Sequence, residues 1–142
     1  MMTGDLVTFL LAQGPINELV GKGIRPVKSP SGSALPHITL EQIGAKHDRC
    51  NAGRTGLAND HYQITAWGRT DAEAEAVAQA ISDAIGAAVN VMMGGTAVDH
   101  AEVTTERDMP VINASAQAIT TFAKQLDVAI WHAEQGAILQ VN

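Results

Sequence analysis

The segment from Thr70 to Ala88 most constrains the fold, because it has the pattern of a one-sided helix. Thr70 and Glu73 have the spacing of a capping box, and Asp71 places a negative charge in the first turn, where the helix dipole favours it. Apolar side chains then recur on a single face, at Ala74, Val77, Ala78, Ile81, Ile85 and Ala88. Such a helix must cover an apolar surface, and its alanines permit close approach to a sheet.

Strand patterns on either side of this helix predict the surface that it covers. The run 57–68 places Tyr62, Ile64 and Ala66 on one face and polar or aromatic residues on the other. The run 119–132 also alternates, with Leu126, Val128 and Ile130 on one face. Shorter patterns predict strands over 37–43 and 96–107 and helices over 6–11 and 15–20.

This order of elements predicts a single α+β domain over residues 1–142. We expect an antiparallel four- to five-stranded sheet with the helices packed on one face. Between the elements, the glycine- and proline-rich stretch 21–36 predicts extended chain leading into the sheet. The polar runs Gly44 to Gly56 and Asp108 to Ala116 predict loops.

Composition limits the class of protein. With 142 residues, 46% of them hydrophobic and 17% charged, the chain is long and apolar enough for one globular core. The single Cys50 rules out an intrachain disulfide framework, and the apolar run 6–12 is too short for a membrane span. We therefore expect a soluble protein with no membrane partner, made in the cytoplasm.

Charge is separated along the chain, and the net charge of −6 argues against general nucleic-acid binding. Residues 22–54 contain six cations and only two anions, Glu41 and Asp48. The net charge of this part is therefore about +4, and that of the remainder is −10. The six cations are Lys22, Arg25, Lys28, Lys46, Arg49 and Arg54. Such separation favours attraction between unlike surfaces of two copies, although a solvated basic loop explains it equally well.

No motif predicts a catalytic residue, a cofactor site or a metal site. Gly21 and Gly23 begin a G-x-G, but Pro26 stands where a dinucleotide fingerprint needs a third glycine. His47, Asp48 and Cys50 lack the spacing of a zinc site. Cys50 as a nucleophile would need a base and an oxyanion hole that the sequence does not indicate, so an ordinary thiol is favoured.

Several features in order resemble the tail-completion family of long-tailed bacteriophages, whose members are tail terminators or tail-to-head joining proteins. The resemblance covers roughly Leu10 to His132. It rests on "LVGKGIRPVKSPSGSALPHITLEQI", on "HYQITAWGRTDAEAEAVAQAISDAI" after a polar stretch, and on the closing "DVAIWH".

The resemblance implies an α+β fold, a hexameric ring at the head-proximal end of the tail tube, no cofactor and no catalytic residues. It implies as partners further copies of the chain, the tail tube protein and the head-tail connector, with DNA passing through the lumen without specific binding. The location would be the virion tail, after assembly in the cytoplasm of the bacterial host.

Residue assignments follow from charge rather than from a motif. The six cations above would face a neighbouring subunit or tail partner, and Arg25 and Arg69, near strand ends, would pair with acids such as Glu102 or Glu106 of a neighbour. Trp67 and Trp131 are either interface anchors or, as we favour, strand tryptophans packed under a helix.

Two other functions stay open at this point. A different head-tail connector or minor tail protein would share the size, the acidity and ring formation. A small ligand-binding α+β domain would need a concave apolar pocket with convergent polar groups.

Overall fold

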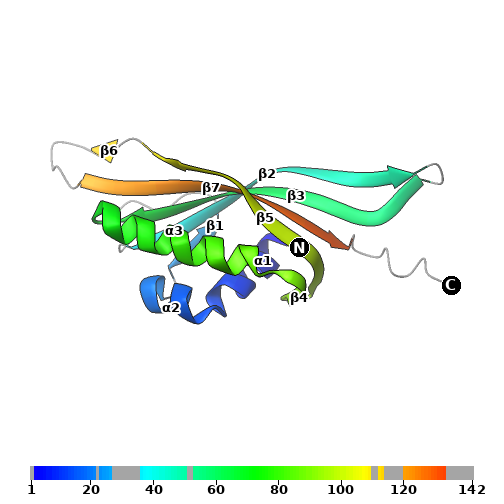
Figure 1. Cartoon of the computed structure of the whole chain (residues 1–142), viewed down its shortest axis with the longest axis horizontal. Helices are drawn as coiled ribbons and strands as arrows, with labels where there is room; N and C mark the ends of the chain where they lie inside the picture. Colours follow the sequence, from blue (N-terminus) through cyan, green and yellow to red (C-terminus); the bar gives the residue numbers. More distant parts are fainter. Residues whose placement is uncertain are drawn as a thin grey trace.

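The structure is a computed structural model that describes residues 2–21, 23–26, 36–50, 53–109, 112–113 and 120–133. Three helices lie below one face of a twisted sheet (Figure 1). The helices are α1 (Met2–Leu11), α2 (Gly14–Val20) and α3 (Asp71–Gly86). The strands are β1 (Ile24–Pro26), β2 (His37–Cys50), β3 (Gly53–Gly68), β4 (Val89–Met93), β5 (Thr96–Asp108), β6 (Ile112–Asn113) and β7 (Thr120–Ala133).

The last of these strands lies in the middle of the sheet. The strand order is β1-β2-β3-β7-β5-β4, so β7 is inserted between the β2–β3 hairpin and the β4–β5 hairpin. Strands β2, β3, β7, β5 and β4 pair antiparallel, β1 adds parallel to β2, and β6 pairs with the start of β7. The predicted α+β class, with five antiparallel strands and helices on one face, is confirmed.

The core lies between α3 and the sheet, as the two apolar patterns predict. All six apolar positions of the helical stripe are buried. They face Tyr62, Ile64, Leu126, Val128 and Ile130, each no more than 1% exposed. Helix α1 contributes Leu6 and Leu10 to the same cluster, and α2 contributes Ile16. Burial of such side chains contributes roughly 1.5–3 kcal/mol each, so this cluster carries most of the folding energy.

The predicted capping box is half confirmed. The Thr70 hydroxyl accepts a hydrogen bond from the Glu73 backbone N–H at 3.1 Å, which caps α3 as predicted. The Glu73 carboxylate, however, accepts from the backbone N–H of Arg69 at 2.8 Å, one residue before the position that a capping box uses. The Arg69 side chain binds the same carboxylate, and this second attraction explains the displaced contact.

The prediction of a loop over Gly44 to Gly56 is wrong. Strand β2 continues to Cys50 and β3 starts at Gly53, and the two pair as far as Cys50 with Gly53. We call residues 44–50 and 53–56 the arm, because these strand segments extend beyond the helix-covered part of the sheet (Figure 1). Apolar alternation is missing there because no helix covers this part, so neither face of the hairpin needs apolar side chains.

Of the second predicted loop, Asp108 to Ala116, the described residues are in strands except for Met109, so the prediction is wrong for most of them. Strand β5 runs through Asp108, and Ile112–Asn113 forms the short strand β6. Residues 110–111 and 114–116 lie outside the described part of the chain.

The favoured placement of Trp67 and Trp131 under a helix is also wrong. Neither side chain belongs to the core cluster or packs against it from its rim. Trp67 donates from Nε1 to the Thr39 hydroxyl at 2.9 Å, and its ring stacks near His37 on the strand alongside. Trp131 stacks on His100 with ring centroids 4.3 Å apart. Both tryptophans therefore lie on the sheet face opposite the helices, where sheet alternation puts odd-numbered residues of β3 and β7.

Asp5 ties α1 to the turn between β4 and β5. Its carboxylate accepts hydrogen bonds from the Thr96 hydroxyl and, at 3.3 Å, from the backbone N–H of Gly95. The adjacent Gly94 has a φ of +57°, and a Cβ placed there would come within 2.4 Å of the Asp5 carboxylate. The turn thus needs glycine both for its backbone conformation and for the close approach of Asp5.

The change Gly94→Ala should lower the free energy of unfolding by more than about 1 kcal/mol, since alanine is strained at this φ and its methyl group displaces Asp5. Urea unfolding followed by circular dichroism measures the loss. The matched control is Gly95→Ala, because a Cβ at Gly95 meets no atom within 4 Å. Equal stability of the two variants would contradict this account of the turn.

The same tether should make stability depend on acid pH. The Thr96 hydroxyl and the Gly95 N–H hold the pKa of Asp5 below its ordinary value, against a smaller opposing effect of burial. A lowered folded-state pKa stabilises the protein above the unfolded value of about 4, and this contribution is lost as the pH falls through the folded pKa. Asp5→Asn should therefore lower the melting temperature at pH 7. Below pH 4, the difference in melting temperature between the variant and the unchanged chain should become smaller. A constant difference across that range would oppose this role.

Candidate assembly surfaces

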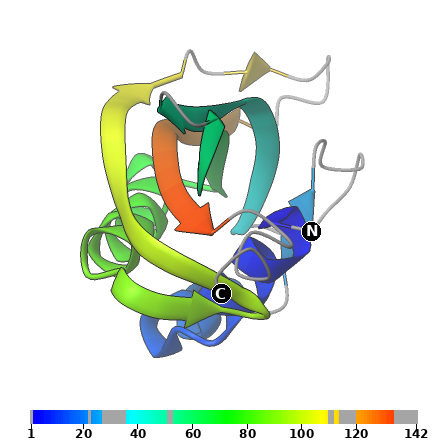
Figure 2. The same cartoon turned by 90° about the vertical axis from the view of Figure 1, so that its right-hand side faces the viewer.

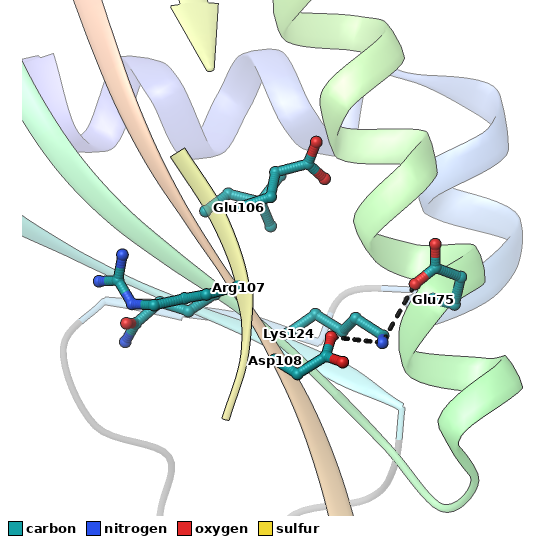
Figure 3. Close-up of a pocket in the computed structure, with 7 residues that line it drawn as sticks. Glu75, Glu106, Arg107, Asp108 and Lys124 are labelled. Atoms are coloured by element: carbon teal, nitrogen blue, oxygen red, sulfur yellow. Dashed lines mark hydrogen bonds and ion pairs between the residues drawn. The ribbon is translucent and has the colours of Figure 1, made fainter. Parts of the chain in front are cut away.

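An acidic cleft lies where α3, β5 and β7 meet. Its volume is about 350 Å³, and it is lined by Glu75, Glu106, Arg107, Asp108, Lys124, Gln125 and Leu126. Figure 3 shows the Lys124 ammonium group directed toward Asp108 and Glu75, from the strand next to Asp108. Its Nζ lies 2.6 Å from Asp108 and 3.2 Å from both Glu75 and Asp71.

Lys124 neutralises only part of this acidic group. The hydrogen bonds that the ammonium group donates to Asp108, and then to Glu75 and Asp71, raise its pKa well above its usual range, although burial opposes the shift. One cation among three carboxylates leaves a net charge of −2, and Glu106 adds another negative charge at the rim. Arg107 does not compensate, because its side chain pairs with Asp127 at 3.1 Å. The cleft is therefore an acidic surface region held together by one mostly buried lysine.

A second polar group is enclosed at the other end of the sheet. His132 Nε2 lies 3.0 Å from the Asp60 carboxylate, and both residues are buried. The neighbouring Tyr62 hydroxyl shares a 3.1 Å hydrogen bond with Thr3 of α1, and burial raises the pKa of Tyr62 to about 12. Histidine, aspartate and tyrosine can carry out acid-base chemistry, but here all three are buried, and none lines the acidic cleft. Their arrangement is that of a structural polar contact inside the core.

The structure describes most of the predicted interface residues and places the basic and the acidic ones on different strands. Lys22 and Lys28 lie outside the described residues. The other cations of that set take strand positions, Arg25 in β1, Lys46 and Arg49 in β2, and Arg54 in β3. Glu102 and Glu106 are brought together on one exposed strand, β5. The fold thus puts the predicted basic and acidic residues on different strands of one sheet.

Arg69 has a partner within its own chain. Its guanidinium group binds Glu73 through Nε at 3.2 Å and Nη2 at 2.9 Å, and this contact lowers the pKa of the Glu73 carboxylate. A contact between Arg69 and a neighbour's acid remains a prediction, and it would have to compete with this pair.

The Lys124 cluster was missed in the sequence. Lys124 stands in an apolar alternation between Phe122 and Leu126, where a lysine is out of place. Asp71 and Glu75 have the i,i+4 spacing that puts them on one face of α3. Together these signals could have indicated a buried lysine under the start of the helix, but the contribution of Asp108 depends on the strand order.

The described part of the chain contains no group of three or more histidine, cysteine, aspartate and glutamate side chains suited to a metal ion. Of the candidates considered above, His47 and Cys50 are strand residues of the arm, and Asp48 stands at a register shift between β2 and β3. None of the described helices is long and apolar enough to cross a membrane.

Lys124→Met should destabilise the fold by about 1 kcal/mol at pH 7, because three largely exposed carboxylates then lose their shared cation and repel one another. The raised pKa stabilises the folded state fully below the unfolded lysine value of about 10.4, and this contribution is lost as the pH rises through the folded pKa. Thermal melting at several pH values measures this contribution to stability. The control Glu106→Gln, in the same cleft, should change little. A loss of stability that is unchanged at high salt concentration, where the attraction between charges is screened, would contradict the ionic explanation.

Comparison with known proteins identifies the family. The family model described as "Tail completion protein gp17" matches residues 4–131. Among solved structures, a chain in "Virion of native gene transfer agent (GTA) particle" superimposes with a TM-score of 0.65 and 18% sequence identity, over 90% of this chain and 92% of that one. No curated protein matches the sequence. The arrangement of three helices on an antiparallel sheet is therefore shared with a component of a phage-like particle, and the chain belongs to the tail completion protein gp17 family, with a structural role in the virion tail.

Proposed function

We propose that copies of this chain form a ring that caps the head-proximal end of the tail tube. The ring would end tail polymerisation by presenting a surface that tube protein cannot extend, and this surface would receive the head-tail connector. The observation that carries the proposal is the family match over residues 4–131. The structural likeness to a chain from a gene transfer agent virion supports it, since that protein works in an assembled particle.

A sixfold ring is the form that we infer for the assembly, with the tail tube protein below it and the connector above it. A closed ring requires two different surfaces of each copy to meet around a rotation axis. The chain offers such a pair in its basic arm and its acidic β5. DNA would pass through the lumen without specific binding, in keeping with the net charge of −6. Assembly in the bacterial host cytoplasm would precede packaging into the virion.

The polar lining of the acidic cleft favours assembly over binding of a small molecule. Ligand pockets are mainly apolar, with a few convergent polar groups. The acidic cleft has charged or polar side chains at six of its seven lining positions, with Leu126 as the exception. A different connector or a minor tail protein would use similar surfaces, and partner identity distinguishes these functions.

The test mixes the protein with tail tubes assembled from the tube protein of its own particle. Light scattering across a concentration series measures its mass alone, and electron microscopy examines the tube ends. We expect a ring at a single end of each tube and no further growth from that end when more tube protein is added. Tubes that lengthen equally from both ends with the protein present would overturn the proposed function. If the protein bound to the isolated connector instead of to tubes, a function as a different head-tail connector protein would be favoured.

A further inference from the structure

Two strands, β5 and β2, each have a backbone edge that lacks a hydrogen-bonding neighbour over part of its length, within the described part of the chain. On β5, pairing with β4 reaches only to His100, and a single bond from Ala101 to Ala88 follows. Beyond it, residues 102–108 pair with β7 alone. On β2, pairing with β1 covers only Ile38 to Leu40, and the strand then pairs with β3 alone as far as Cys50. Figure 2 shows β5 as a long strand at the outside of the sheet.

Both open segments are largely exposed wherever the structure describes their side chains. Between Glu102 and Asp108 every side chain except that of Val103 is exposed, and residues 41–45 are all exposed. Ile43, an apolar side chain, is 52% exposed on the second segment. An exposed edge strand presents unpaired backbone N–H and C=O groups, and it is a template for pairing with another chain. Neither segment contains proline, which would block such pairing.

The two edges carry opposite charge. Segment 102–108, which we call the acidic edge, has Glu102, Glu106 and Asp108 against Arg107, a net charge of −2. The β2 strand of the arm, residues 44–50, has Lys46 and Arg49 against Asp48, a net charge of +1, and Arg54 on the neighbouring β3 pairs beside Arg49. Neither Glu102 nor Glu106 forms an ion pair within the described residues, so both are available to an outside cation.

We propose that the acidic edge of one copy pairs, antiparallel, with the β2 strand of the next copy's arm, joining the sheets of neighbouring copies into one. This inference rests on the proposed ring and names its subunit contact. The occupant is a second copy because a single chain supplies both complementary edges, at opposite sides of one sheet. Because β2 and β5 run in opposite directions, a rotation about an axis along the strands brings them together antiparallel.

Register sets a further geometric condition. Through β7 and β3, Glu102 lies level with Gly44 and Asp108 lies level with Ile38. The acidic edge is therefore level with the start of β2, whereas the open part of β2 extends farther, to Cys50. Pairing the acidic edge centre to centre with residues 44–50 displaces neighbouring copies by about six residues, roughly 20 Å along the strands. Closed sheets accommodate such a stagger by tilting their strands against the axis, so the strands of the ring should be tilted.

Charge reversal on each edge separately gives a specific test. The double variant Glu102→Lys/Glu106→Lys makes both edges basic, and Lys46→Glu/Arg49→Glu makes both edges acidic. Each variant alone should lose rings, with the concentration needed for assembly raised at least tenfold. An equimolar mixture should regain rings with alternating subunits, because every contact again joins an acidic and a basic edge. Native mass spectrometry distinguishes the two kinds of subunit, and ring assembly is tested both in solution and on tube ends.

The controls separate folding from assembly. Thermal melting of each variant shows that it folds, and the control Glu18→Lys/Asp83→Lys makes the same charge change at exposed helical positions. This control should still form rings. Variants that assemble as well as the unchanged chain, or a mixture that fails to recover, would overturn the edge pairing and leave the ring intact. Failure of the unchanged chain to form rings either in solution or on tubes would instead overturn the proposed function itself.

Discussion

Strand β7 hydrogen-bonds along its length to both hairpins, and the rest of the fold depends on this double pairing. Its partners run from Leu57 to Gly68 on β3 and from Val98 to Asp108 on β5. The same strand supplies Leu126, Val128 and Ile130 to the surface under α3. Without β7, the two hairpins would each have an exposed inner edge, and the apolar stripe of the helix would lack the centre of its support. The acidic cleft also depends on it, because Lys124 is a β7 residue.

Elements with a strong local pattern were predictable from the sequence. The stripe of α3, the alternation of β3 and the long final strand are each set by residues close in the chain. The predicted bounds of β5 and β7 differ from the observed ones by at most one residue at each end. Strand β4 was missed, because Val89 and Met92 are exposed and the strand has no alternation to detect. The place of β7 between the hairpins also could not be predicted from local patterns, because strand order is decided by contacts between distant residues.

The arm shows the limit of hydrophobic patterning in another way. A polar stretch with several glycines is typical of a loop, yet here two such stretches pair with each other as a hairpin. Backbone hydrogen bonds do not depend on side-chain polarity, so a hairpin outside the core leaves little trace in hydropathy. Charge was more informative than hydropathy. The separation of basic and acidic residues along the chain corresponds in the structure to different strands, with Lys46 and Arg49 in β2 and Glu102 and Glu106 in β5. Their roles in an interface remain predictions.

The central place of β7 also has a consequence for the timing of synthesis. Ribosomes release a chain from its N-terminus onward, so β2, β3 and β5 emerge before the strand that must separate β3 from β5. Pairings between distant residues form slowly, and β3 lies about sixty positions before its β7 partners. A nascent chain therefore cannot complete the sheet until β7 has emerged. Until then the inner edges of β3 and β5 lack their neighbour and can pair with another chain, so the arrival of β7 ends the interval in which nascent chains are prone to associate.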